Sequence, residues 1–277
     1  MGRIAGVFAM GHAPNLITTW DAAGPEVCQG VLNGCAEVAK RIRAAGATTL
    51  ITIGNDHFNN FFLNNFPALC IGMADTWIGP EDDLRYEAVK IKGNAKLSRH
   101  IVEHLYEHEG FDPSLSYNLK LDHGTFVPVR FTFPEFELPL VPIFQNTVHP
   151  PMQPLQRSRQ FGAALRRAIE SYPADERVVV IGTGGISHFI GVPNQGYINE
   201  DFDHRVLDMM RAGDLEGLAG LSRAEVGAAG NGAEEIRNWI AAMSVAEGNK
   251  AEVIFYAAVP AWLIGVGIAD FHYASSN

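Results

Sequence analysis

TTLITIGNDH, at residues 48–57, joins a run of β-branched and aliphatic residues directly to the polar side chains of Asn55, Asp56 and His57. The apolar run is continuous rather than alternating, which is typical of a strand buried on both faces of a parallel sheet. Glycines bound the run on both sides, so its length is that of one strand. The stretch therefore predicts an α/β fold in which polar residues follow the end of a buried strand.

The same unit recurs along the chain. Further apolar runs of strand length lie at Arg3–Met10, Leu140–Phe144, Arg177–Ile181 and Glu252–Val259, with a weaker one in SYNLKLDHG at residues 116–124. Helical stripes, with apolar residues every three or four positions, cover Val27–Ile42 and Phe161–Tyr172. Strands that alternate with helices predict a mostly parallel central sheet covered on both faces. Because no repeat or linker interrupts the pattern, we expect residues 1–277 to form a single three-layer αβα domain.

Charge and composition exclude several classes of partner. A formal net charge of −10 disfavours nucleic acid, because affinity for phosphate backbones depends on lysine and arginine. The longest apolar stretch, Val253–Ala269, contains Pro260 and is predicted to be a buried strand and a pocket wall rather than a membrane span. The first residues show no export signal, and the three cysteines have no metal-site spacing. We therefore expect a cytoplasmic protein without a membrane or nucleic-acid partner.

Polar residues gather after the predicted strands. His12, His57, Asn146 and His188 each lie within a few residues of a strand end. The carboxyl ends of parallel strands meet at one edge of a sheet, and ligands of open α/β folds bind there. The three histidines are therefore expected to converge there, and His123 joins them if residues 116–124 form a strand followed by a loop. The alternative that Asp56 and its neighbours only build an Asx turn stays open.

Two further motifs are rich in glycine or glutamate. GTGGISH, at residues 182–188, lacks the lysine of a phosphate-binding loop and is predicted to form a tight floor that presents Ser187 and His188 to a small substrate. NGAEEIRNW, at residues 231–239, opens a helix, where Glu234 and Glu235 would complement the helix dipole. The pattern alone does not separate this structural role from a catalytic one.

Taken together, the motifs resemble those of a known family. GHAPN at residues 11–15, GNDH, LDHGTFVP at 121–128, GTGGISH and GNGAEEIRNW occur in an order and spacing that are similar to the class III extradiol ring-cleavage dioxygenases, among them the β subunit of protocatechuate 4,5-dioxygenase. The resemblance covers nearly the whole chain. It implies one αβα domain that opens a catechol-like ring with both atoms of O2.

The resemblance also implies roles for individual residues. His12, His57 and Glu235 match the ligands of an Fe(II) ion, with Glu234 as the alternative carboxylate in this register. Two histidines and one carboxylate on one face of iron leave positions open for substrate and O2. His188 matches the family's acid and base, and His123 matches a second histidine of the pocket.

Other assignments carry less support from the sequence. Asp56 and Asp122 are predicted to fix the imidazole rings, and Asn146, Ser187 and Trp262 to contact the substrate or support the site. The expected partners are a small aromatic substrate and O2 within a homo-oligomer, and a small accessory subunit stays an open question. A catechol, a 2-aminophenol and a hydroxypyridone would all chelate iron in a similar way, so the sequence does not choose among these rings. A metal-dependent hydrolase and a non-catalytic subunit of a dioxygenase complex are the alternatives.

Overall fold

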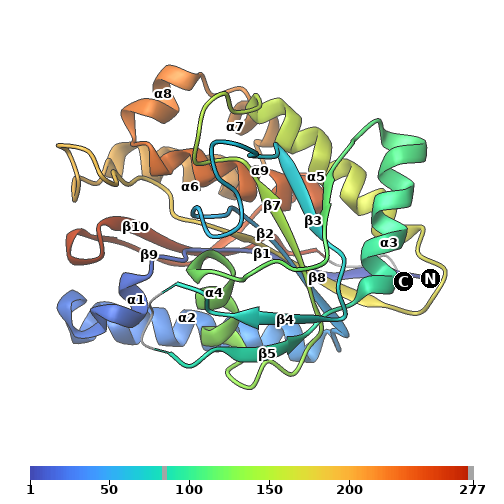
Figure 1. Ribbon diagram of the computed structural model, residues 1–277. Coiled ribbons are helices and arrows are strands. Elements are labelled where there is room, and N and C mark those ends of the chain that lie inside the picture. The colour runs from blue at the N-terminus through green and yellow to red at the C-terminus, as the bar shows by residue number, and fades with distance from the viewer. Residues whose placement is uncertain (83–85, 274–277) are drawn as a thin grey trace.

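One twisted sheet forms the centre of the molecule in the computed structural model, which describes residues 1–82 and 86–273 (Figure 1). Its strands lie in the order β6-β3-β7-β2-β8-β1-β10-β9. Their bounds are β1 (Arg3–Met10), β2 (Thr49–Gly54), β3 (Leu69–Gly72), β6 (Ser114–Ser116), β7 (Leu140–Gln145), β8 (Arg177–Thr183), β9 (Glu252–Val259) and β10 (Ile264–Asp270). A separate hairpin pairs β4 (Thr76–Gly79) with β5 (Val89–Lys92).

The middle of the sheet is parallel. Strands β7, β2, β8 and β1 run in one direction, with Thr52 and Phe8 both paired to Ile181 of β8. The outer strands β3, β10 and β9 join through antiparallel pairs, whereas β6 pairs parallel to β3. The prediction of a mostly parallel sheet is confirmed, and the continuous apolar runs occupy its buried centre because both of their faces are covered.

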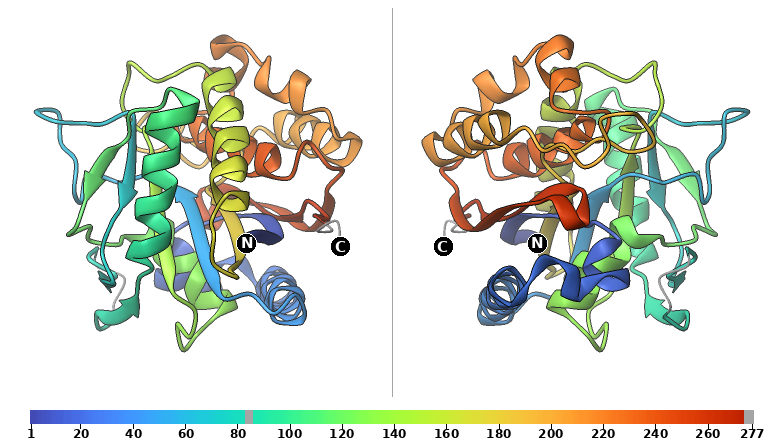
Figure 2. Two further views of the ribbon diagram at one scale, coloured as in Figure 1. Left: turned by 90° about the vertical axis from the view of Figure 1, so that its right-hand side faces the viewer. Right: turned by 90° about the vertical axis from the view of Figure 1, so that its left-hand side faces the viewer.

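Helices cover both faces of this sheet (Figure 2). One face carries α2 (Pro25–Ala44) and α4 (His123–Thr132), and the other carries α3 (Ala95–His104), α5 (Leu155–Glu170), α6 (Glu200–Ala212), α7 (Leu215–Ala219), α8 (Arg223–Ala228) and α9 (Ile236–Val245). Short elements are α1 (Asn15–Thr18), η1 (Trp20–Ala23), η2 (Leu105–Glu109), η3 (Gly232–Glu235) and η4 (Pro260–Trp262). Phe161 and Trp239 belong to one apolar core, and Val38 and Phe126 to another. Two cores separated by a sheet make the predicted αβα sandwich.

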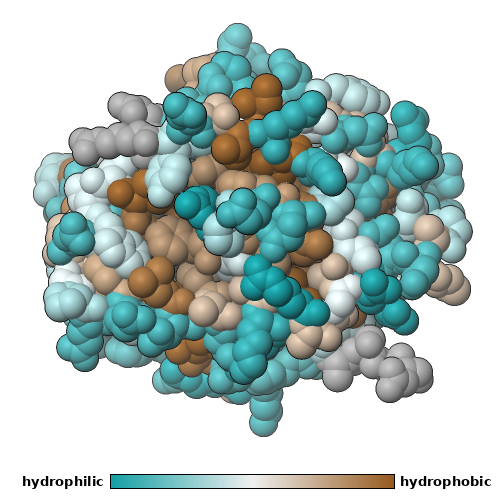
Figure 3. All heavy atoms as spheres, turned by 90° about the horizontal axis from the view of Figure 1, so that it is seen from below, coloured by the Kyte–Doolittle hydropathy of each residue, from teal (hydrophilic) through white to brown (hydrophobic). Residues whose placement is uncertain are grey.

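The side of the molecule that bears α2 and β5 also has an apolar surface. Seen from this side, brown apolar side chains gather in a hollow near the middle of the face and polar ones surround them (Figure 3). Leu32, on α2, is 43% exposed, although the helix buries Val31 and Cys35. Among the described residues, no helix combines the length and apolar character needed to cross a bilayer.

One local prediction was wrong. Residues 117–121 do not form a ladder strand, because Lys120 makes only an isolated bridge to Ile78. His123 begins α4, and Asp122 caps that helix by accepting the Gly124 N–H at 2.9 Å. Aspartate is a favoured N-cap, so the chain enters a helix directly after Asp122.

The apolar stretch Val253–Ala269 forms a hairpin of two strands, of which the sequence predicted the first, Glu252–Val259, with its end before Pro260. Strand β9 ends before Pro260, and Leu263 turns the chain with a φ of 64° into β10. Strand β10 pairs with β1 only from Ile268 onward, so its first residues extend past the end of β1. This projecting tip of the β9–β10 hairpin carries Trp262.

Candidate active site

A cavity of about 320 Å³ lies at the edge of the sheet where the parallel strands end. His12 follows β1, His57 follows β2 and His188 follows β8, and all three line this cavity. Glu235 enters from the last residue of η3, on the segment that leads into α9. The sequence expectation that side chains from distant strands converge at this edge agrees with this placement.

Three ligand-type atoms lie close together at the floor of the cavity. Glu235 Oε1 lies 3.1 Å from His12 Nε2 and 3.4 Å from His57 Nε2. A divalent first-row metal bonds imidazole nitrogen and carboxylate oxygen at about 2.0–2.2 Å, so ligand atoms at right angles around it lie about 3 Å apart. The donor set and its spacing therefore fit a metal ion.

The Nδ1 atoms of His12 and His57 already have polar partners. His12 Nδ1 lies 3.2 Å from the Thr183 hydroxyl oxygen. His57 Nδ1–H donates to Asp122 Oδ2 at 3.0 Å, and the same oxygen accepts the His57 backbone N–H at 2.8 Å. Such contacts fix the ring orientation and leave Nε2 of each ring facing the cavity, which is how metal-binding histidines are usually held.

The backbone around Glu235 settles which glutamate faces the histidines. Glu235 Oε2 accepts the Gly185 N–H at 2.8 Å, and a Cβ at Gly184 would lie 2.8 Å from the Glu235 Cβ. Glycine is therefore required at Gly184, whose φ of 141° also disfavours other residues. Glu234 turns away and pairs with Arg237. The glycines of GTGGISH thus approach a carboxylate, not the substrate that the sequence suggested.

Charge at the cavity floor is shared between acids and imidazoles. Burial alone would raise the pKa of Glu235, but the neighbouring His12 and His188 hold it well below its usual range. Burial alone would lower the pKa of His57, whereas the Asp122 and Glu235 carboxylates raise it to about 10 in the metal-free protein. Glu235 is therefore ionised, as a metal ligand must be.

His188 approaches the carboxylate oxygen of Glu235 that does not contact His12 and His57. Its Nε2 is 3.7 Å from Glu235 Oε2, and its Nδ1 has no hydrogen-bond partner among the described residues. Burial lowers the pKa of His188 from its usual value near 6.5. A buried imidazole that is neutral at physiological pH can accept a proton from a bound substrate.

His123 lies beside two of the other cavity histidines, His12 and His57. Its ring stacks on His57 with centroids 3.9 Å apart, and its Nδ1 contacts Asp82. His12, His57 and His123 together have ligand atoms within 4.8 Å of one another, so an all-histidine metal set is the alternative. The shorter contacts of Glu235 to His12 and His57 favour the carboxylate as third ligand and place His123 next to the metal position.

A comparison with known families gives the chemistry that such a site performs. The model of the catalytic LigB subunit of aromatic ring-opening dioxygenases matches residues 6–267. The chain belongs to this family. It is therefore a ring-opening dioxygenase, and the alternatives of a hydrolase or a non-catalytic subunit lose their support.

Curated relatives of this dioxygenase share its length. Proteins named 2,3-dihydroxyphenylpropionate/2,3-dihydroxicinnamic acid 1,2-dioxygenase from Cupriavidus necator and Mycolicibacterium smegmatis are each 28% identical to it. The matches cover 87% and 94% of this chain and 90% and 96% of those proteins, respectively. Among solved structures, an uncharacterized protein from Escherichia coli K12 superposes with a TM-score of 0.58 at 10% identity, over 96% of this chain and 99% of that one. That likeness concerns the fold alone.

Two of the residues predicted to support the site of the dioxygenase do so: Trp262 lines the cavity, and Asp122 contacts the cavity residue His57. Asp122 holds His57, as described above, and so occupies the position expected of an orienting carboxylate. Trp262 lines the cavity and donates its indole N–H to the Thr19 carbonyl at 3.1 Å. Its ring also stacks on Trp20 with centroids 5.4 Å apart, which anchors the tip of the β9–β10 hairpin.

Asp56, Asn146 and Ser187 do not face the cavity of the dioxygenase. Asp56 accepts the backbone N–H groups of Asn59, Asn60 and Phe61, so it builds the Asx turn that was the alternative interpretation of GNDH. It touches no imidazole, and its predicted part in fixing the rings finds no support. Its role in the described structure is to shape the loop after His57.

The other two residues also have structural partners. Asn146 caps the turn after β7 by accepting the N–H groups of Val148 and His149. Ser187 is fully buried, and its hydroxyl oxygen accepts the Asn199 N–H at 2.9 Å. The prediction that Ser187 is presented to the substrate does not agree with this position, because the tight turn directs His188 and not Ser187 toward the cavity.

Sequence reasoning missed several residues that support the dioxygenase site. The Asn55 amide donates to Glu235 Oε1 at 3.2 Å, and its carbonyl oxygen accepts from the Asn238 amide at 3.2 Å. Thr183 contacts His12, and Asp82 contacts His123. Asn55 and Thr183 stand inside the quoted motifs and could have been singled out, whereas Asp82 lies in a loop with no local signal.

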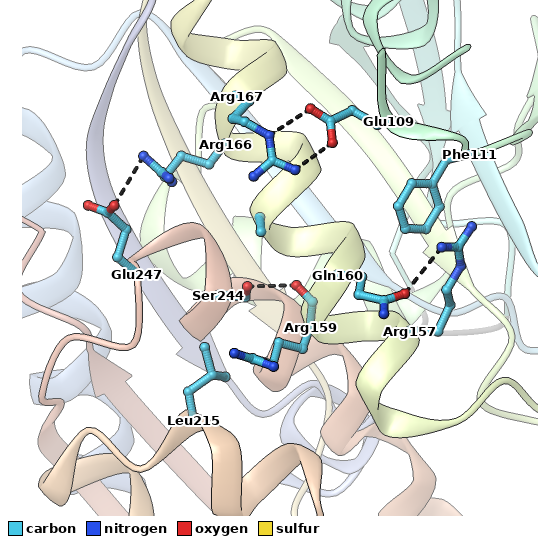
Figure 4. Close-up of a pocket in the computed structure, with 11 residues that line it drawn as sticks. Glu109, Phe111, Arg157, Arg159, Gln160, Arg166, Arg167, Leu215, Ser244 and Glu247 are labelled. Carbon is cyan, nitrogen blue, oxygen red and sulfur yellow. Dashed lines mark hydrogen bonds and ion pairs between the residues drawn. The ribbon is translucent and has the colours of Figure 1, made fainter. Parts of the chain in front are cut away.

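A larger cleft, of about 520 Å³, lies elsewhere on the dioxygenase, beside α5 and η2 (Figure 4). Its arginines are engaged by other groups: Arg159 with Glu216 at 2.8 Å, Arg166 with Glu247 at 3.2 Å, Arg167 with Glu109 at 2.7 Å, and Arg157 over the Phe111 ring at 3.6 Å. None of the predicted site residues lines it. Because its arginines already have partners and it contains none of the predicted site residues, this cleft is a surface feature and not the reaction site.

Proposed function

We propose that this dioxygenase uses Fe(II) held by His12, His57 and Glu235 to cleave a catechol-like ring in the extradiol manner. The observation that carries the proposal is the approach of one Glu235 oxygen to the Nε2 atoms of both histidines. Two neutral imidazoles and one carboxylate on one side of a ferrous ion are the ligand set of non-haem oxygenases. The bound ion supplies open positions at which the ring oxygens and O2 meet.

Side chains of the protein then transfer protons and orient the substrate and the metal ligands. His188 is proposed as the base, because its buried and neutral imidazole can take the proton of a ring hydroxyl at Nε2 and return it later. His123 is held at Nδ1 by Asp82, which leaves its Nε2 free to orient the reacting oxygen atoms. Asp122 and Thr183 keep His57 and His12 in the ligating orientation.

The cavity supports a substrate with a single ring. Its volume of about 320 Å³ is at the lower end of typical ligand pockets, which span about 300–1,000 Å³. Relatives of this chain are named for 2,3-dihydroxylated aromatic acids, which favours a catechol over an aminophenol or a hydroxypyridone. We therefore propose a monocyclic catechol as the ring that is opened.

Oxygen consumption tests this proposal. The protein is loaded with Fe(II) without air, mixed with panels of catechols, 2-aminophenols and hydroxypyridones, and then exposed to O2. We expect one O2 to disappear for each catechol, with a yellow ring-fission product, and no activity in His57→Ala. Iron-loaded protein that consumes no O2 with any ring, or zinc-loaded protein that hydrolyses an ester instead, contradicts the proposal.

Assembly and location belong to the same proposal. Exposed apolar side chains support a homo-oligomer, since Phe62 and Leu63 are 53% and 71% exposed at the tip of the loop after His57. Light scattering from the purified chain would give a dimer or larger particle, and a monomer contradicts this. Full activity of the chain alone would show that it needs no accessory subunit. The three cysteines are buried and unpaired, which supports a reducing cytoplasm.

A further inference from the structure

Much of the wall of the active-site cavity is apolar. Trp262, Leu263 and Ile264 come from the tip of the β9–β10 hairpin, and Val148 and Ile190 come from the loops after β7 and β8. A ring bound in this cavity therefore has its substituents next to hydrocarbon side chains.

The described lining of the cavity has no basic side chain of the lysine or arginine type. Among the described residues that line it, Glu235 is the single carboxylate, and no lysine or arginine takes part. The proposed Fe(II) ion would lie at Glu235 and serve the ring hydroxyls, and Arg237, two residues after Glu235, pairs with Glu234. The described apolar wall therefore offers no lysine or arginine that could pair with an anionic substituent on the ring.

Burying an unpaired carboxylate against such a wall is unfavourable. A carboxylate that loses its water without gaining a cation is destabilised. The Asn231 amide is already used, because it accepts the Ile190 N–H at 2.9 Å and donates to the Ile190 carbonyl at 2.8 Å. The buried Thr147 hydroxyl has no partner among the described residues, but it is a neutral donor and does not balance the charge of a carboxylate.

We propose that this cavity selects catechols whose remaining substituents carry no charge, and that catechols with a carboxylate side chain are poor substrates. The proposal rests on the function proposed above. It separates this chain from the relatives named for 2,3-dihydroxyphenylpropionate, whose side chain ends in a carboxylate. The residues that set the selection are the apolar side chains of the hairpin tip together with Val148 and Ile190.

A matched pair of substrates tests the selection. The acid 3-(2,3-dihydroxyphenyl)propionate and its methyl ester share ring and chain length and differ in charge. On the iron-loaded enzyme we expect kcat/KM for the ester to exceed that for the acid by at least about tenfold. Calorimetric titration without O2 should give a lower Kd for the ester than for the acid, and this measurement does not depend on turnover.

A substitution at Ile190 can add a charge to the wall of the cavity. Its side chain is 49% exposed at the mouth, and Asn231 fixes its backbone, so Ile190→Arg adds a cation there without a core defect. Val192, 39% exposed two residues later, does not line this cavity, so Val192→Arg is the matched control. We expect Ile190→Arg to raise the acid-to-ester ratio by about three- to tenfold in low salt, and Val192→Arg to leave it unchanged.

The outcomes separate the two proposals. Absence of O2 uptake with both compounds, although both bind, counts against the dioxygenase chemistry and leaves the selection to be judged by Kd. A wild-type enzyme that prefers the acid or treats both alike overturns the selection, even if ring opening is confirmed.

Because Arg85 lies outside the described residues, the acid and the ester are also compared on Arg85→Gln. We expect the preference for the ester to be the same, and a preference for the acid that depends on Arg85 overturns the proposal.

Discussion

At the scale of single residues, His188 and His57 share a cavity but have different neighbours. His57 is tied to Asp122 and lies 3.4 Å from Glu235 Oε1, whereas His188 has no partner at Nδ1 among the described residues. This difference suits His57 to hold a metal and His188 to move a proton. The two roles can be separated by measuring metal content and turnover on the same variants.

Replacement of His188 tests the proton role. We expect His188→Ala to retain iron and catechol binding but to lose about 10²- to 10⁴-fold in kcat, the usual contribution of a general base. Metal analysis, anaerobic titration with a catechol and O2 uptake give the three values. His57→Ala is the comparison and should lose the metal. Iron content at the wild-type level in His57→Ala would refute the ligand assignment.

Asp122 and Asp56 provide a second pair of variants. Asp122→Asn removes the acceptor that orients His57, so we expect metal affinity to fall about 10- to 100-fold. Asp56→Asn disturbs the turn after His57 without touching an imidazole, so affinity should stay the same while stability falls by about 1–3 kcal/mol. Competition with a chelator and urea unfolding measure the two effects. Equal loss of affinity in both variants would show that Asp122 acts only on loop structure.

At the scale of elements, the turn before α9 is built around His188. Gly232 donates its N–H to the His188 carbonyl at 3.1 Å, and a Cβ at Gly232 would lie 2.0 Å from His188 Nε2. The imidazole therefore fills the space that any larger residue at position 232 would need. The glycine in GNGAEE is required by packing against the proposed base.

Substitution of Gly232 by alanine, which adds one methyl group, tests this packing. We expect Gly232→Ala to displace the His188 ring and to lower kcat at least about tenfold, with metal content unchanged. Gly227→Ala, on the exposed side of α8 with open space around it, is the control. That change should leave kcat unaltered and add up to about 1 kcal/mol of stability through helix propensity. Normal kcat in Gly232→Ala would mean that the ring does not need its observed position.

Several strands and helices could be predicted from the sequence, because their apolar residues have the spacing of a buried strand or of one helix face. Strands β1, β2, β7 and β8 are continuous apolar runs, and the stripe of α2 is spaced for one helical face. Strand β10 was not predicted, although Pro260 marked the end of β9, because the turn between the two strands depends on the positive φ of Leu263, and leucine is not a turn signal. The start of α4 was missed because Asp122 acts both as helix cap and as partner of His57.

Only part of the site could be predicted from the sequence. Placement after strand ends brought His12, His57 and His188 into consideration, but the choice between Glu234 and Glu235 depends on a backbone contact with Gly185. Tertiary contacts of this kind leave no periodic signal in the sequence. Asp82, which reaches His123 across 41 residues, is another such contact.

At the scale of the whole molecule, Asp203 connects separate layers. Its side chain is fully buried on α6, where it accepts the Ser187 N–H and the Tyr256 hydroxyl, both at 2.8 Å. The backbone of Gly265, in β10, also lies against this carboxylate. Burial, opposed by these hydrogen bonds, raises the pKa of Asp203 to about 6 from an ordinary 3.8. The folded protein therefore binds this proton at a pH where the unfolded chain has released it.

This shift predicts how stability depends on pH. Since the folded state binds more protons between pH 3.8 and about 6, the contribution of Asp203 to the free energy of unfolding falls as pH rises through that window. In Asp203→Asn that dependence should be absent. The stability of the variant relative to wild type should then increase by up to about 3 kcal/mol from pH 4 to pH 7. Urea unfolding of both metal-free proteins at several pH values measures it, and a constant difference contradicts the assignment.

The β9–β10 hairpin provides the pocket wall yet contributes none of the proposed metal ligands. It sits at one margin of the sheet, and its tip projects beyond β1, so its length and side chains can vary without moving the strands that position His12, His57 and His188. Evolution can therefore alter which compound is accepted while the reaction itself is preserved. Libraries randomised at positions 262–264 are accordingly the economical route to variants with new aromatic specificity.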